Sequence, residues 1–369
     1  MAPDPGFPAG PDHAGGSLLN LTAELEHRLT GSAPSPRLAG RLAEVIPDAP
    51  TYVFVLFDGL GDAQLDHEAA APLRASRRAA IDAPFPTTTT VSLATIATGL
   101  APVTHGLVAY QLWLPETDRV VGTIKWTTLW GEAVAVDHDA FLPAPNLWER
   151  LVAAGAEPIT VQPWNFQGTP LSRVLYRGCR WEPWADEADA VDAALQLAAE
   201  PGRLVFLYLP HVDFAAHVRG QASEAYSDAV TIVARAWERL AARLPEGAVA
   251  VGTADHGHVD VPPDRRAIIS KADQGDRILY GDARAMFVRG GDGSLADTLP
   301  ATWVPREDME HWWGPGPRHR RFAERVPDGV LLADPGHALL HRHSDDRLVG
   351  QHGGLTPAEM RIPLLVAGG

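Results

Sequence analysis

Six carboxylate and imidazole side chains in this sequence could bind metal ions. They follow or precede apolar segments of the chain: Asp58, Asp213, His217, Asp255, His256 and His352. Asp213 and His217 stand four residues apart, so they would face the same way on a helical turn. Each residue alone is more simply interpreted as a solvated loop or capping group. Six together favour two divalent cations, and mixed His and Asp donors suit Zn²⁺ first and Mn²⁺ or Fe²⁺ second.

A threonine-rich segment offers a candidate nucleophile. Residues 85–99 begin Phe-Pro-Thr-Thr-Thr-Thr and end in Thr-Gly. After the turn at Pro86, residues 90–98 are best interpreted as a buried helix that ends at Gly99, although threonine has weak helix propensity. A helix start favours an anion, and a divalent cation would make a threonine hydroxyl there acidic enough to attack. The simpler alternative for this segment alone is a helix cap without chemistry.

The elements that position these residues follow an alternating pattern. Apolar runs at 51–57, 203–209 and 248–254 each lead to one of the three aspartates, and a further apolar run at 362–368 follows His352. Helical patterns lie between them at 147–154, 187–199 and 224–244. We therefore expect an α/β fold with a largely parallel sheet covered on both faces. Ligands of such sheets bind outside the carboxyl ends of the strands, where the three aspartates would converge.

The pattern also divides the chain into regions. Residues 1–49 form an N-terminal extension with one helix near 17–29, and residues 50–258 with 350–369 form the core. Residues 259–349 interrupt the strand pattern and contain five of the 15 histidines, so we interpret them as an inserted cap. Trp312 and Trp313 in this cap are candidates for substrate contact. His337, His341 and His343 are interpreted as a solvated helix end, and His258 as a residue behind the metal ligands.

Composition excludes several classes of protein. The 369 residues contain 31 Lys and Arg against 46 Asp and Glu, a net charge of −15, and no basic run that would hold a nucleic-acid polymer. The single cysteine, Cys179, excludes an intrachain disulfide and cysteine-rich zinc modules. We find no signal peptide and no apolar stretch of membrane-spanning length, so we expect a cytoplasmic protein without a membrane partner. The oligomeric state stays open.

Five short motifs occur in a characteristic order between residues 57 and 354. They are Phe57-Asp58-Gly59-Leu60; Pro86-Thr-Thr-Thr89 with Thr98-Gly99 and His105-Gly106; Asp213-Phe-Ala-Ala-His217; Ala254-Asp255-His256-Gly257; and His352-Gly353-Gly354. Together they resemble the nucleotide pyrophosphatase/phosphodiesterase family of the alkaline phosphatase superfamily. The resemblance implies an alkaline phosphatase-like three-layer sandwich.

The resemblance also implies roles for individual residues. The family's nucleophilic threonine stands three residues after the proline and ten before the glycine, and both counts lead to Thr89. One zinc would be bound by Asp58, Asp255 and His256 and would touch Thr89. The other would be bound by Asp213, His217 and His352. A phosphoric ester hydrolase with a phosphothreonine intermediate is implied, acting on a small-molecule phosphoester.

Departures from the family motifs bear on the substrate. Tyr110 stands where the family places an asparagine, and its phenol could donate to a phosphoryl oxygen or simply pack. No Lys or Arg occurs between residues 79 and 118, which favours a singly charged, diester-like group, unless Lys125 or Arg284 reaches the site. Alternatives are a phosphonoacetate hydrolase-like enzyme that cleaves a C–P bond and a phosphomonoesterase of the same superfamily. A non-enzymatic metal-bearing scaffold would have lost a ligand or the nucleophile, and neither is lost.

Overall fold

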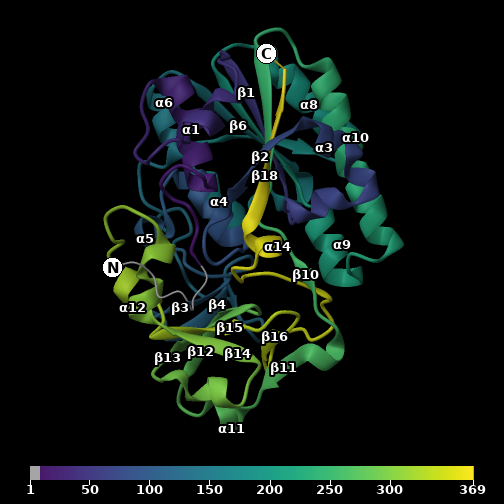
Figure 1. Ribbon diagram of the computed structural model, residues 1–369. Helices are drawn as coiled ribbons and strands as arrows, with labels where there is room; N and C mark the ends of the chain where they lie inside the picture. The colour runs from purple at the N-terminus through teal and green to yellow at the C-terminus, as the bar shows by residue number, and fades with distance from the viewer. Residues whose placement is uncertain (1–8, 369) are drawn as a thin grey trace.

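The computed structural model describes residues 9–368, which form two seven-stranded sheets in two lobes (Figure 1). The central sheet has the order β2-β18-β9-β1-β8-β6-β7. Its strands are β1 (Thr51–Phe57), β2 (Arg77–Asp82), β6 (Glu157–Pro163), β7 (Arg180–Trp184), β8 (Arg203–Leu209), β9 (Ala248–Thr253) and β18 (Arg361–Ala367). β9, β1, β8, β6 and β7 run parallel, and β18 runs antiparallel to both β9 and β2. The prediction of an α/β fold with a largely parallel sheet is confirmed.

Helices cover both faces of the central sheet. Figure 1 shows α1, α4 and α6 on one side and α3, α8 and α10 on the other, so the expected three layers are present. The longer helices are α1 (Leu18–Thr30), α4 (Thr89–Thr98), α6 (Leu147–Ala153), α8 (Glu187–Ala198), α9 (His211–Arg219) and α10 (Glu224–Arg243). Every residue of β1 is buried, as expected for a strand between two helical layers.

The N-terminal helix α1 is part of the core. Nine of its 13 residues are buried, and it packs against α4 and α6. A capping box begins it, in which the Asn20 side-chain oxygen accepts the backbone N–H of Ser17 at 3.0 Å. Because α1 covers the helix that carries the candidate nucleophile, it supports the site indirectly.

The second sheet is antiparallel and has the order β14-β15-β13-β12-β3-β4-β5. Its strands are β3 (Gln111–Leu114), β4 (Arg119–Gly122), β5 (Thr127–Thr128), β12 (Ile278–Asp282), β13 (Ala285–Arg289), β14 (Ala301–Pro305) and β15 (Gly329–Ala333). Three of these strands come from residues 111–128, outside the expected cap of 259–349. The second lobe is therefore built from two separate stretches of chain that pair through a single β3–β12 register position, Gln111 with Gly281.

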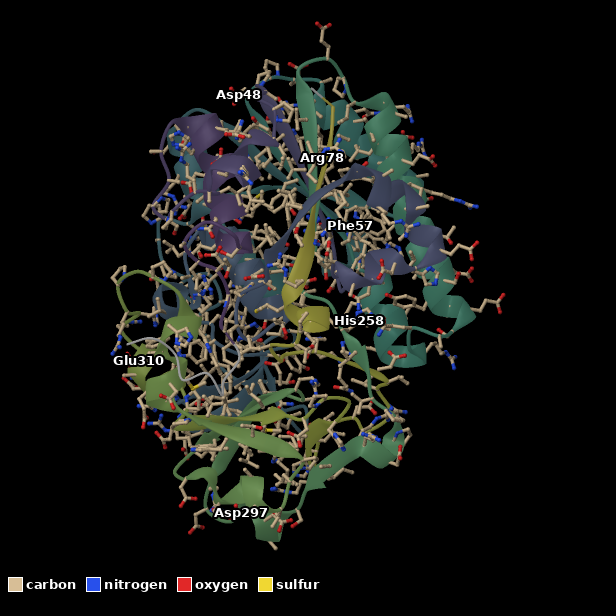
Figure 2. The ribbon with its side chains drawn as sticks, viewed as in Figure 1. Asp48, Phe57, Arg78, His258, Asp297 and Glu310 are labelled. Atoms are coloured by element: carbon tan, nitrogen blue, oxygen red, sulfur yellow. The ribbon has the colours of Figure 1, made fainter. Side chains whose placement is uncertain are left out.

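Two small ladders and several short elements complete the fold. β10 (Val259–Asp260) pairs with β17 (Gly350–Gln351), and β11 (Arg266–Ile269) pairs with β16 (Ala338–His341). Short helices are α2 (Gly40–Glu44), α3 (Ala71–Ser76), α5 (Pro102–His105), α7 (Pro170–Leu175), α11 (Lys271–Gln274), α12 (Arg306–Met309), α13 (Phe322–Arg325) and α14 (Pro357–Met360). Short 3₁₀ turns occupy Ala63–Asp66, Glu68–Ala70, Trp164–Phe166, Pro263–Arg265, Gly293–Asp297 and Glu310–Trp313. In Figure 2, Asp297 marks the far tip of the second lobe, and His258 lies toward the junction of the lobes.

Two interpretations of the second lobe were wrong. Trp312 and Trp313 are buried and pack on Phe85, with ring centroids 4.8 and 5.3 Å apart, so they belong to the core and do not contact substrate. His341 is the last residue of strand β16 and is buried, so the three neighbouring histidines do not form a solvated helix end. Within residues 9–368, no helix is long and apolar enough to cross a membrane.

Candidate metal centre and active site

The expected ligands meet at one edge of the central sheet. Asp58 follows β1, Asp213 lies in the first turn of α9 after β8, and Asp255 follows β9. His352 comes nine residues before β18, which runs antiparallel to β9. The beginning of β18 therefore lies at the edge where the parallel strands end, and His352 joins the aspartates there.

The first cluster consists of Asp58, Asp255 and His256, all buried. His256 Nε2 lies 3.4 Å from Asp255 Oδ2 and 3.8 Å from Asp58 Oδ1. Asp255 Oδ1 accepts the backbone N–H groups of Gly59 and His256, at 2.9 and 3.0 Å. Asp255 Oδ2 is buried without a hydrogen-bond partner. A fully buried carboxylate oxygen that nothing satisfies is costly unless it binds a cation.

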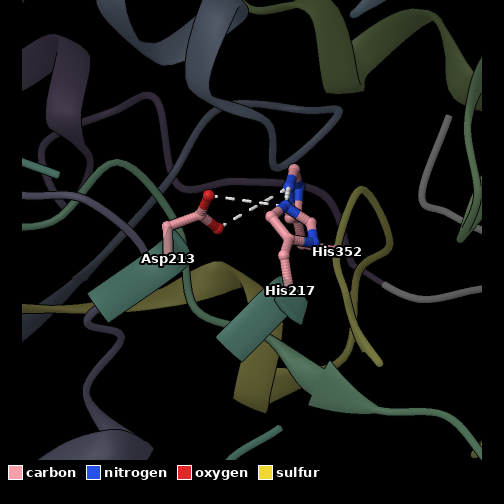
Figure 3. Close-up of side chains that lie close together, drawn as sticks. All are labelled: Asp213, His217 and His352. Carbon is pink, nitrogen blue, oxygen red and sulfur yellow. Dashed lines mark hydrogen bonds and ion pairs between the residues drawn. The ribbon is translucent and has the colours of Figure 1, made fainter. Parts of the chain in front are cut away.

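The second cluster consists of Asp213, His217 and His352 (Figure 3). The Nε2 atoms of the two histidines are 3.2 Å apart, and His217 Nε2 is 3.4 Å from Asp213 Oδ2. His352 Nε2 is 4.0 Å from Asp213 Oδ1, an oxygen that is also buried without a hydrogen-bond partner. Three donor atoms thus converge on one point, as a metal site requires.

Backbone carbonyls orient all three imidazoles. Nδ1 of His217 donates to Gly350 O at 2.7 Å, Nδ1 of His352 donates to Thr87 O at 2.9 Å, and Nδ1 of His256 donates to Gly257 O at 2.9 Å. A carbonyl can only accept, so the proton of each neutral ring sits on Nδ1. Each Nε2 then turns a lone pair toward its cluster, the arrangement typical of metal-ligating histidines.

The electrostatics of both clusters fit a cation. Burial, together with the nearby Asp255 and Asp213 carboxylates, holds the pKa of Asp58 well above its usual value. Burial and the neighbouring His256 and His217 hold the pKa of His352 well below its usual value. Crowded carboxylates beside neutral imidazoles form a donor set that suits divalent Zn²⁺, Mn²⁺ or Fe²⁺.

Thr89 is the first residue of α4 and points into the first cluster. Its Oγ1 lies 3.1 Å from His256 Nε2 and 3.4 Å from Asp58 Oδ1. The prediction of a buried helix ended by Gly99 is confirmed, because all ten residues of α4 are buried and Gly99 takes the left-handed conformation with φ of 62°. Ser92 Oγ donates to Asp255 O at 2.7 Å and so ties α4 to the end of β9.

A cavity of about 520 Å³ opens in front of Thr89. Asp213, His217 and His352 line it from the core, while Met286, Leu339 and Leu340 line it from the second lobe. Lys125 is the only lysine or arginine among its lining residues in the described part of the chain. Tyr110 also lines the cavity, and a side chain on Gly122 would lie 3.6 Å from its hydroxyl. Lys125 and Tyr110 therefore both face the space where a substrate would bind.

Arg284 takes a different place from the one expected. It is buried, and its guanidinium pairs with the buried Glu359, with Nε 3.3 Å from Oε1 and Nη2 3.3 Å from Oε2. It also donates to the carbonyl oxygens of Asp334 and His337. The ion pair and these hydrogen bonds hold a turn of the second lobe against the core. Arg284 is therefore not available to a substrate.

Two residues of the site were missed by sequence reasoning. The Tyr208 hydroxyl donates to Asp58 Oδ2, and Tyr208 is a polar side chain within the buried part of β8. Asp282 lines the cavity and ends the apolar strand β12. The sequence around each residue could have indicated its role. Tyr208 is a polar residue within an apolar run, and Asp282 is an aspartate at the end of an apolar strand, as in the pattern of the three predicted aspartates. His258, by contrast, is buried beside Tyr226 with both ring nitrogens unpaired and joins neither cluster.

The sequence matches one protein-family model, type I phosphodiesterase/nucleotide pyrophosphatase, over residues 52–355. No curated protein matches it significantly. Similar solved structures include murine ectonucleotide pyrophosphatase/phosphodiesterase 5, with a TM-score of 0.64 and 20% identity over 86% of this chain and 88% of that one. The human counterpart has a TM-score of 0.63 and 18% identity over 86% and 87%.

An enzyme of different chemistry is similarly close. Phosphonoacetate hydrolase from Sinorhizobium meliloti 1021, solved with phosphonoformate, has a TM-score of 0.62 and 20% identity over 87% of this chain and 91% of that one. An inactive variant of the murine protein was solved in complex with AMP. At these identities the likeness of the structures establishes the alkaline phosphatase-like fold, and the choice of substrate depends on the site itself.

Proposed function

Because the chain belongs to the type I phosphodiesterase/nucleotide pyrophosphatase family, hydrolases that act on phosphoester bonds, we propose that it is a two-metal phosphodiesterase in which Thr89 is the nucleophile. One observation carries the proposal. Thr89 Oγ1 points into a buried Asp/Asp/His cluster, and a second Asp/His/His cluster lines the same cavity.

The residues present fit two divalent ions. Asp58, Asp255 and His256 would hold one, and Asp213, His217 and His352 would hold the other. Such ions supply Lewis acidity and stabilise negative charge that develops on phosphoryl oxygens. The two unpaired buried oxygens, Asp255 Oδ2 and Asp213 Oδ1, support this assignment.

Thr89 supplies the covalent step. Its Oγ1 forms a bond to phosphorus while the bond to the leaving oxygen breaks in line; the hydroxyl proton passes to water, and the leaving oxygen departs as an anion or takes up a proton from water. Water then attacks the phosphothreonine from the opposite side, which releases the product and restores the threonine hydroxyl. Each displacement inverts phosphorus, so the overall reaction proceeds with retention of configuration.

The walls of the cavity favour a diester. Lys125 is the only lysine or arginine among the lining residues in the described chain, so a phosphoryl dianion would find little positive charge from the protein itself. Tyr110 lines the cavity, and its phenol would donate to a phosphoryl oxygen. Burial raises the pKa of Tyr110, which keeps its phenol protonated. A small nucleotide is one substrate class to test, because the murine relative was solved with AMP.

Lys125 favours a second candidate function, cleavage of the C–P bond of a small carboxylated phosphonate. Its exposed side chain lines the cavity, where it would pair with the substrate carboxylate. Lys125→Met would then abolish phosphonate turnover. It would leave nearly unchanged the cleavage of a phosphodiester whose ester groups carry no charge.

The proposal is tested with a panel of substrates and a stereochemical experiment. The zinc-loaded protein should cleave bis-p-nitrophenyl phosphate with higher kcat/KM than p-nitrophenyl phosphate or phosphonoacetate. A diester made chiral at phosphorus should give product with retained configuration. Inversion would remove Thr89 as nucleophile, and a monoester or phosphonate preference would overturn the diester assignment.

A further inference from the structure

Asp282 brings a negative charge from the second lobe to the catalytic cavity. It ends strand β12, is buried, and lines the cavity together with Thr88 and Thr89. The Tyr110 backbone N–H donates to Asp282 Oδ2 at 3.5 Å. The carboxylate therefore lies among the residues that surround the phosphoryl position, although it comes from the other lobe.

Close packing fixes Asp282 against the second cluster. A Cβ on Gly353, the residue after the ligand His352, would lie 2.4 Å from Asp282 Cβ, so only glycine fits there. Two residues beyond Asp282, Arg284 is held by the buried Glu359, which also accepts the backbone N–H of Gly354 at 2.9 Å. The turn that carries Asp282 is thus locked to the segment that carries His352.

Within the described residues, no lysine or arginine forms an ion pair with Asp282. The neighbouring Arg284 is committed to Glu359, and Lys125 is the only lysine or arginine among the described residues that line the cavity. Burial raises the pKa of Asp282 to about 7, against hydrogen bonds from the Thr88 side chain and the Tyr110 N–H that lower it. In alkaline solution the group is an anion in the wall of the cavity.

We propose that Asp282 is a specificity-determining residue that disfavours phosphoryl groups with two negative charges. Repulsion in a buried site grows with the charge of the ligand, so a dianionic monoester is penalised more than a monoanionic diester. This inference rests on the proposed function. It names Asp282 as the residue that makes the enzyme prefer diesters over monoesters.

The test compares the isosteric variant Asp282→Asn with a matched control at about pH 8.5, above the pKa of Asp282. The asparagine keeps the size of the side chain and an oxygen for the Tyr110 N–H but removes the charge. We expect the ratio of kcat/KM for p-nitrophenyl phosphate to that for bis-p-nitrophenyl phosphate to rise about tenfold. In the control, Asp297→Asn, the ratio should stay unchanged, because Asp297 is exposed at the tip of the second lobe and is not among the residues that line the cavity.

A measurement on the unaltered enzyme makes the test independent of how the variant folds. Inorganic phosphate, a dianion, should inhibit no more strongly than dimethyl phosphate, a monoanion, and Asp282→Asn should strengthen inhibition by phosphate selectively. An unchanged ester ratio in Asp282→Asn, an equal loss of both activities, or strong phosphate inhibition of the unaltered enzyme would each overturn the role of Asp282. If the unaltered enzyme cleaved neither ester, that result would contradict the proposed phosphodiesterase function itself, and the role of Asp282 would fall with it. The other outcomes would contradict the role of Asp282 alone.

Discussion

The imidazole rings of His256 and His352 stack with their centroids 3.8 Å apart and their planes 19° apart. His256 belongs to the first cluster and follows β9, whereas His352 belongs to the second cluster and precedes β18. The stacked pair therefore joins the two clusters into one centre. Two cationic rings would repel each other at this distance, so the stacked pair disfavours a positive charge on both imidazoles at once, and the neutral imidazole is the form that binds metal.

The nucleophile can be separated from metal binding. Thr89→Ala should lower kcat by about a thousandfold or more, because alanine lacks the Oγ1 that lies 3.1 Å from His256 Nε2 and that would attack phosphorus. Metal content should stay the same, since the Asp and His ligands remain. Thr89→Ser should keep measurable turnover because it retains the hydroxyl. Full activity in Thr89→Ala, measured with bis-p-nitrophenyl phosphate, would contradict the assigned role.

Removal of one ligand should remove one ion. In Asp255→Asn the buried Oδ2 loses its charge, so elemental analysis should find about one fewer divalent ion per chain and activity should fall steeply. Chelation of the unaltered protein should lower its unfolding temperature, because buried carboxylates lose their counterion. The exposed Asp297 at the tip of the second lobe provides the control, since Asp297→Asn should leave metal content and activity unchanged.

The Tyr208 hydroxyl donates a hydrogen bond to Asp58, a proposed metal ligand. Tyr208→Phe removes the hydrogen bond to Asp58 Oδ2 and should weaken metal affinity by about 10- to 100-fold. Tyr176→Phe is a matched control, because the partly buried Tyr176 packs on Phe206 of the same strand and accepts a hydrogen bond from Gln162 at 2.9 Å rather than bonding to Asp58. Competition with a metal-binding dye would measure both affinities. Equal affinities in the two variants would refute the supporting role of Tyr208.

The buried His105 should make stability depend on pH. Burial lowers its pKa from 6.5 to about 3, and its ring accepts the Leu107 N–H and contacts the Thr95 hydroxyl at 3.2 Å. The unfolded chain takes up the proton first, so the stabilisation present above pH 6.5 is lost as the pH falls toward about 3. Thermal unfolding between pH 7 and about pH 4.5 should show a shallower decline for His105→Gln than for the unaltered protein. Identical slopes would exclude His105 as a source of the dependence.

Much of the core could be predicted because its signals are local. The runs 51–57 and 203–209 form β1 and β8 with the expected bounds, and the three acids after apolar strands meet at one edge of the sheet. A buried parallel strand needs continuous apolar residues, and its carboxyl end is where polar groups can gather, so residue type and position carry the information.

The second lobe could not be predicted in the same way. Its sheet joins β3 (Gln111–Leu114) to β12 (Ile278–Asp282), far apart in the chain, and no periodicity within residues 259–349 indicates that these strands pair. Trp312 and Trp313 were predicted to contact substrate, but they pack on Phe85 in the core. Arg284 was predicted to be able to reach the substrate, but it pairs with the buried Glu359, which stands 75 residues away in the sequence.

The sequence by itself determined the family, the layered α/β core, the identity of the donor residues and the position of Thr89 at a helix start. Residue types and their spacing along the chain are sufficient for these. Only the tertiary structure decided that β18 runs antiparallel and so brings His352 to the aspartates, that Tyr208 supports Asp58, and that Asp282 reaches the cavity from the other lobe. These relationships join residues far apart in the chain, and the free energy of close packing and buried polar pairing selects them only once the whole core has formed.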